Sequence, residues 1–161
     1  MRIGVISDTH IPCAAKELPR RVLDLLAGVD AIIHAGDYQD VSVIETLQSI
    51  APFYGVAGNM DSHDIRQLVP EKRILSLGGF FLGVMHGGGA PQGLEDRIAA
   101  SFKGEKVDAV IYGHSHLPVS SLKKNILFFN PGSPTDSRFA EYNSMGILTL
   151  NATITGEIVR L

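Results

Sequence analysis

Residues 2–10 read RIGVISDTH, a short apolar run that ends in a polar turn. The run is rich in β-branched side chains, so residues 2–7 predict a buried strand. Two amphipathic segments, residues 18–27 and 41–49, predict helices, and residues 30–34 and 52–56 predict the next two strands. This β-α-β-α-β order is typical of parallel neighbouring strands joined by right-handed crossovers, and it places the chain in the α/β class.

The second half of the chain is richer in strands. One helix is expected at residues 92–102, and strands are expected at residues 73–77, 80–85, 108–112, 119–122, 126–129, 145–150 and 153–159. About ten strands are too many for a simple doubly wound sheet. We therefore predict a four-layer α/β/β/α sandwich of two mixed β-sheets, formed by a single domain over residues 1–161.

The composition argues against several classes of partner. The chain has 161 residues, a net charge of −3 and no basic run longer than two residues, so neither a nucleic-acid groove nor a polybasic membrane patch is indicated. No apolar run is long enough to span a membrane, and no secretory leader is recognisable. The single cysteine, Cys13, cannot form an internal disulfide. We expect a cytoplasmic protein.

Metal-binding residue types recur where the predicted strands end. In open α/β sheets, ligands bind beyond the carboxyl ends of the strands, so residues at these turns should converge on one edge. Glycines beside several of them would let the turns approach closely. The seven candidates are Asp8, His10, Asp37, Asn59, His86, His114 and His116.

These seven side chains offer four imidazoles, two carboxylates and one amide. That set exceeds the needs of one tetrahedral zinc ion but suits two divalent ions about 3.5–4 Å apart. Two carboxylates leave a pair of divalent ions with net positive charge, so the centre would still attract a phosphate.

The same residues resemble the motifs of the calcineurin-like metallophosphoesterase superfamily, and within it the small phosphodiesterases of the YfcE type. The resemblance spans nearly the whole chain. In order, the motifs are D-x-H at 8–10, GD at 36–37, GN at 58–59, HG at 86–87, GHSH at 113–116 and NPGS at 130–133.

The resemblance implies a division of the ligands and a reaction. One ion would be held by Asp8, His10 and His116, the other by Asn59, His86 and His114, with Asp37 bridging both. Manganese is the expected metal, with nickel, iron or zinc as alternatives. A metal-bridging hydroxide would attack the phosphorus of a small phosphodiester, so Asp37, Asn59 and His86 are catalytic candidates and Asn59 is also a substrate contact.

Two positions depart from the family pattern. Many relatives carry a histidine after the GN asparagine, where it can protonate the leaving group, whereas this chain has Met60. Asp61 or His63 could replace it through a water molecule. Relatives often read HGH where this chain has HGGG, so Gly88 removes a histidine and we expect a roomier, more mobile entrance loop.

Other polar residues have ordinary explanations. We expect His34 to be a packing residue, and Arg138 to be either a contact to the substrate phosphate or, by preference, a solvated side chain. Cap, turn or surface roles are expected for the remaining conspicuous carboxylates, which are Asp30, Asp40, Asp64, Asp96, Asp108 and Asp136.

Two questions stay open on sequence alone. The same fold serves as a non-catalytic scaffold in the Vps29 subunit of retromer, and Met60 keeps that alternative in view. An apolar edge strand such as residues 80–85 could be covered by the chain itself or by a second copy in a homo-oligomer.

Overall fold

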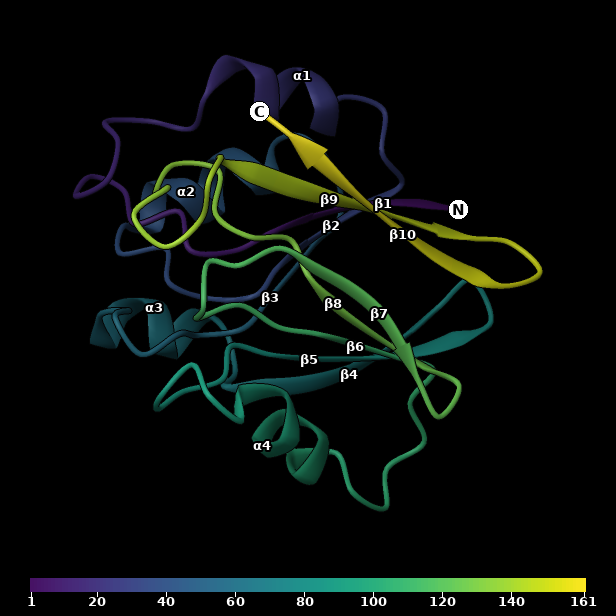
Figure 1. Ribbon diagram of the computed structural model, residues 1–161. Helices are drawn as coiled ribbons and strands as arrows, with labels where there is room; N and C mark the ends of the chain where they lie inside the picture. Colours follow the sequence, from purple (N-terminus) through teal and green to yellow (C-terminus); the bar gives the residue numbers. More distant parts are fainter.

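The computed structural model describes residues 1–161 as two five-stranded sheets with four helices (Figure 1). The strands are β1 (Arg2–Ile6), β2 (Ala31–His34), β3 (Phe53–Gly55), β4 (Lys72–Leu77), β5 (Phe80–Met85), β6 (Ala109–Ile111), β7 (Val119–Lys123), β8 (Ile126–Asn130), β9 (Ser144–Leu150) and β10 (Ile154–Arg160). The helices are α1 (Arg20–Leu26), α2 (Val41–Gln48), α3 (His63–Leu68) and α4 (Leu94–Ser101).

Both sheets are mixed, as predicted. The first has the order β10-β9-β1-β2-β3, in which β1, β2 and β3 are parallel and β9 and β10 add an antiparallel edge. The second has the order β4-β5-β6-β8-β7, with three parallel strands between antiparallel edges. Strand β5 is therefore not an edge strand: of the two alternatives for residues 80–85, cover by the chain itself is the one observed, with β4 on one side and β6 on the other.

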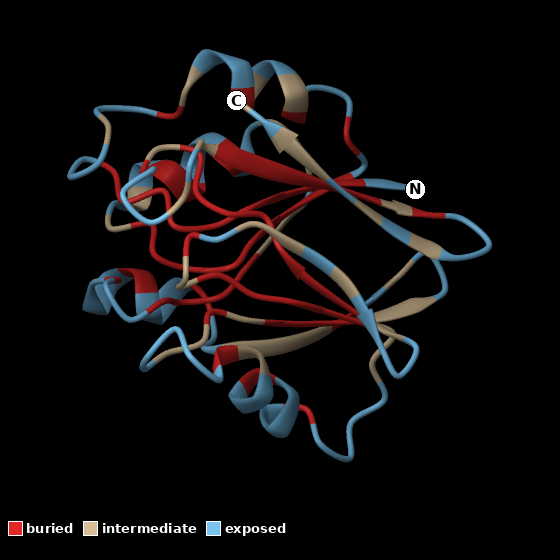
Figure 2. Cartoon of the chain, in the orientation of Figure 1, coloured by how far each residue is buried: buried red, intermediate tan, exposed pale blue.

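Three apolar clusters hold the layers together. Strand residues alternate between them: Ala31 and Ile33 of β2 face the second sheet, whereas Ile32 faces outward. The outward face packs on α1 and α2, and α4 covers the far side of the second sheet through Leu94 and Ile98. Figure 2 shows buried strands in the middle and helices with exposed outer faces. The predicted four-layer α/β/β/α sandwich is confirmed.

Helix α3 is the element that the sequence pattern did not predict. It has six residues, and only Ile65 is buried, so no apolar period of 3.6 is visible. Its start is nevertheless marked, because the Ser62 hydroxyl accepts a hydrogen bond from the Ile65 N–H at 3.4 Å. Helix α4 begins at Leu94 rather than residue 92, after Gly93 in a left-handed conformation with φ 70°. None of the four helices combines the length and apolarity that crossing a membrane requires.

Candidate metal centre

The structure brings all seven predicted ligands to the carboxyl ends of the strands. Five of the seven have positive φ angles, between 44° and 69°, which is unusual for residues other than glycine and marks tight turns. Five are also buried, while His114 is half-buried and Asn59 is exposed. The residues with positive φ are Asp8, His10, Asp37, His114 and His116. The turns hold these side chains in one cluster with an open side.

Asp8, His10 and His116 form the first group. The Asp8 Oδ1 atom lies 3.3 Å from His116 Nε2 and 3.8 Å from His10 Nε2. The two imidazole nitrogens are 3.2 Å apart. These three ligand atoms lie close enough together to hold one cation.

In the second group the ligand atoms follow one another in a series of short distances that starts at Asp37. Its Oδ2 atom lies 3.2 Å from His86 Nε2, which in turn lies 3.1 Å from Asn59 Oδ1. The Asn59 oxygen is 2.9 Å from His114 Nδ1. Asp37 Oδ2 is also 3.8 Å from His10 Nε2, so this carboxylate stands between the two groups.

Asp8 lies nearer to the second group than the family pattern implies. Its Oδ1 atom is 3.8 Å from His86 Nε2, and Asp8, Asp37 and His86 form a second set that can hold a metal. Both carboxylates therefore border both groups.

Two backbone carbonyls fix the tautomers of the second group. His86 Nδ1 donates to Ala35 O at 2.7 Å, and His114 Nε2 donates to Gly89 O at 2.8 Å. The other nitrogen of His114 therefore presents a lone pair to Asn59 Oδ1, which is itself an acceptor. Two acceptors at this distance repel each other unless a cation lies between them. The donor set thus fits a divalent metal ion.

The carboxylates that would attract a cation also change the pKa values of the neighbouring histidines. Burial opposes a charge on His86, but the carboxylates of Asp8 and Asp37 outweigh it and raise the pKa of His86 to about 9. The pKa of His116 is also raised, because Asp8 outweighs the effect of burial. Burial prevails at His10 and lowers its pKa. At neutral pH a metal ion must displace a proton from His86.

Metal affinity should consequently rise with pH. The His86 pKa in the metal-free fold exceeds its ordinary value of 6.5, so the proton stabilises that fold below pH 6.5 and the contribution is lost as pH rises through 9. Between pH 7 and 9 we expect Mn²⁺ affinity to increase roughly tenfold per pH unit from this proton alone. Calorimetric titration at pH 7 and 8 measures the effect, and equal affinities would contradict it.

Asp61 has a structural role. One carboxylate oxygen accepts the N–H groups of Tyr38 and Gln39, and the other accepts those of Asp37 and Gly58, at 2.6–2.9 Å. Both oxygens are thus occupied as acceptors, and the side chain is only 6% exposed. This geometry argues against Asp61 as the leaving-group acid. Instead, the carboxylate ties the GD turn to the GN turn.

We expect Asp61→Asn to destabilise the fold. An amide offers one acceptor oxygen, so two of the four buried N–H groups would face its NH₂ group. The free energy of unfolding should fall by roughly 3 kcal/mol, measured by urea denaturation of the metal-free protein. Asp64→Asn, at an exposed position in the first turn of α3, is the control. A loss no larger than that of the control would show that these hydrogen bonds contribute little.

His34 is a packing residue in the structure. Its Nδ1 accepts the Gly36 N–H at 3.1 Å, so Nε2 carries the hydrogen and donates to the Thr9 hydroxyl, also at 3.1 Å. The ring stacks on Tyr38, and burial lowers its pKa to about 3. Both ring nitrogens are used within the protein, which leaves none for a metal.

Three supporting residues could not be identified from the sequence. Asp136 has the expected turn role, because its Oδ1 accepts the Arg138 N–H at 3.0 Å, but it is also buried, with Oδ2 3.5 Å from His116 Nδ1. Gln39 places its amide nitrogen 3.0 Å from His10 Nδ1. Arg97 donates to the carbonyls of Gly88, Ala90 and Gln92 and so ties the HGGG loop to α4.

A cavity of about 630 Å³ opens directly onto the cluster. Its lining includes the ligands His10, Asp37, Asn59, His114 and His116, together with Met60, Phe139 and Arg138. Arg138 therefore lies at the site, although its guanidinium donates to both Asp136 oxygens. His63 does not line this cavity.

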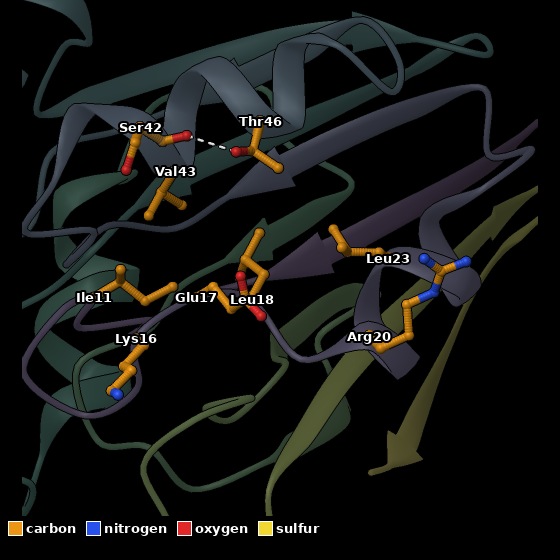
Figure 3. A pocket seen from close by; sticks show the side chains of 9 residues that line it. All are labelled: Ile11, Lys16, Glu17, Leu18, Arg20, Leu23, Ser42, Val43 and Thr46. Atoms are coloured by element: carbon orange, nitrogen blue, oxygen red, sulfur yellow. Dashed lines mark hydrogen bonds between the residues drawn. The ribbon is translucent and has the colours of Figure 1, made fainter.

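A second cavity lies between the residue 11–18 loop, α1 and α2 (Figure 3). It measures about 340 Å³ and contains none of the seven ligands. Lys16, Glu17 and Arg20 bring charge to its lining, and Thr46 donates to the Ser42 carbonyl at 2.8 Å. The cavity at the cluster is therefore the candidate reaction site.

Comparisons with known proteins agree with this geometry. The sequence model of a family described as "Calcineurin-like phosphoesterase superfamily domain" matches residues 1–153. A probable metallophosphoesterase of Methanothermobacter thermautotrophicus is 35% identical over 160 residues, which are 99% of this chain and 92% of that protein.

Solved structures give the same picture. A Thermotoga maritima protein has a TM-score of 0.76 at 36% sequence identity, covering 99% of both chains. Wild-type Vps29 of Entamoeba histolytica, in complex with zinc, has a TM-score of 0.80 at 25% identity and again covers 99% of both chains.

Proposed function

The chain belongs to the calcineurin-like phosphoesterase superfamily, and we propose that it is a metal-dependent phosphodiesterase. In this proposal two divalent ions occupy the cluster, manganese by preference and nickel, iron or zinc as alternatives. Asp8, His10 and His116 would hold one ion, Asn59, His86 and His114 would hold the other, and Asp37 would be shared by both. When bound, the ions supply an ionised water near neutral pH and stabilise charge on the phosphate oxygens.

The facing acceptors at His114 and Asn59 carry the proposal. Their ligand atoms are 2.9 Å apart at the open side of the cluster, and both residues line the cavity. A phosphate that enters the cavity therefore meets ligands of both groups, among which Asn59 and His114 are the most exposed. Asn59 is exposed, so its amide NH₂ group can also donate to a phosphate oxygen.

The charge of the cavity favours a diester over a monoester. Arg138 is the only lysine or arginine in the lining, and it is paired with Asp136. This pairing holds the pKa of Asp136 at about 2, so the carboxylate stays charged. A dianionic monoester would meet no free cation beyond the metals, whereas a diester carries a single charge. An exposed free thiol at Cys13 supports a reducing, cytoplasmic location.

Leaving-group protonation has no evident donor. Asp61 is occupied by four N–H groups, and Met60 cannot transfer a proton. We therefore propose that good leaving groups are cleaved and poor ones react slowly. The preference for a diester over a monoester is tested by comparing bis-p-nitrophenyl phosphate with p-nitrophenyl phosphate, which release the same leaving group, using metal-stripped protein reloaded with Mn²⁺. Preference for the diester supports the proposal, and preference for the monoester contradicts it.

A non-catalytic scaffold is the alternative function. The similarity to Vps29 covers the whole chain, and that structure holds zinc, so metal binding alone cannot separate the two functions. Turnover can. All seven ligands are present in this chain and meet in one cluster, which favours the enzyme.

A further inference from the structure

Exposed apolar side chains gather around the cavity at the cluster. Met60 is 56% exposed, Phe139 is 61% exposed, and Pro91 is also exposed. They come from three different loops, after β3, after β5 and after β8, yet all three line the same cavity. Large apolar side chains that stay exposed beside a polar site are typical of ligand-binding surfaces.

Two of these residues contact the ligands. The Met60 backbone N–H donates to Asp37 Oδ1 at 2.7 Å, which holds residue 60 beside that carboxylate. The Phe139 ring packs edge-on against His116, with ring centroids 5.2 Å apart. The Arg138 guanidinium lies 5.7 Å from the centre of the same ring. The apolar surface is therefore part of the site.

The lining lacks free positive charge beyond the metal positions. Polynucleotides and nucleoside polyphosphates carry extra phosphates that need cationic partners. The lining contains no lysine, and its one arginine is engaged by Asp136. A substrate with one negative charge and an apolar group suits this combination better.

We propose that Met60, Pro91 and Phe139 form a subsite for a flat aromatic ester group of a monoanionic phosphodiester. The inference rests on the proposed function and narrows its substrate class. The phosphate would lie at the ligands, and the ring would cover the exposed faces of Met60 and Phe139. Burial of one aromatic ring should tighten binding roughly tenfold or more.

Two probes test the subsite independently of turnover. The methyl ester of phenylphosphonate and the methyl ester of methylphosphonate carry the same single charge and differ only in the ring. Calorimetry with Mn²⁺-loaded protein gives their dissociation constants. We expect the phenyl probe to bind roughly tenfold tighter, and Phe139→Ala to bring the ratio close to one. Leu122→Ala is the matched control, because Leu122 is 71% exposed on β7 and does not line this cavity.

The possible results distinguish a failure of the proposed subsite from a failure of the proposed function. Equal affinity of the two probes for the unaltered protein, or an unchanged ratio in Phe139→Ala, would overturn the subsite even if diesters are hydrolysed. A ring preference that Phe139→Ala removes would support the subsite even if turnover is absent, and the proposed function alone would then fail. No binding of either probe would overturn the subsite.

Discussion

Asp37→Ala protein is expected to lose tight binding of both metal ions and to fall at least a hundredfold in diester hydrolysis. The Asp37 carboxylate is 2% exposed and lies between His86 and His10, at 3.2 and 3.8 Å. It is the only ligand assigned to both ions. Its removal leaves the imidazoles of both groups with one carboxylate fewer, so the cluster binds cations more weakly.

A second variant, Asp37→Asn, controls for disruption of the turn at residue 37. Asp37 has a φ of 61°, which asparagine tolerates better than alanine, and an amide oxygen can still accept the Met60 N–H. Asp37→Asn should therefore fold like the unaltered protein and still bind metal poorly. Metal content after dialysis, thermal melting and hydrolysis are measured together. Undiminished metal content in Asp37→Asn would contradict the bridging assignment.

His86→Ala and Asn59→Ala should each lose one metal ion and most of the activity. Both residues belong to the second group, where His86 Nε2 lies 3.1 Å from Asn59 Oδ1. Asn59 is exposed, so its replacement should leave stability nearly unchanged, whereas His86→Ala also leaves the buried Ala35 carbonyl without its donor. Metal analysis is expected to show one ion per chain instead of two.

A control on the same strand end sharpens this result. Gly88 adjoins the HG motif and has open space around it, so Gly88→Ala should keep both ions. Full activity or two ions in either ligand variant would show that the ligand assignment is wrong.

The strand-end pattern was a good guide to the site because it follows from the topology. In the first sheet β1, β2 and β3 are parallel, so the turns that carry Asp8, Asp37 and Asn59 open on one edge. In the second sheet β5 and β6 are parallel as well, which brings His86 and His114 to the same place. The number of predicted strands, about ten, likewise led to the two-sheet sandwich, because a single doubly wound sheet would not accommodate them.

Contacts between distant loops lay beyond what local pattern could predict. Asp136 approaches His116 across 20 positions of the chain, and nothing in the neighbouring sequence marks it as different from Asp64 or Asp96. Arg97 ties the HGGG loop to α4, and nothing in the sequence of the loop itself indicates this contact. Asp61 was considered as an acid because its partners, the N–H groups of another turn, are not visible in sequence.

Hydrolysis of bis-p-nitrophenyl phosphate during metal titration tests the central claim most directly. Metal-stripped protein should be inactive, and activity should appear as Mn²⁺ or Ni²⁺ is restored and level off at two ions per chain. Asp37→Ala protein in the same titration should stay inactive. Absence of turnover at any metal loading would contradict the proposed function and favour the scaffold.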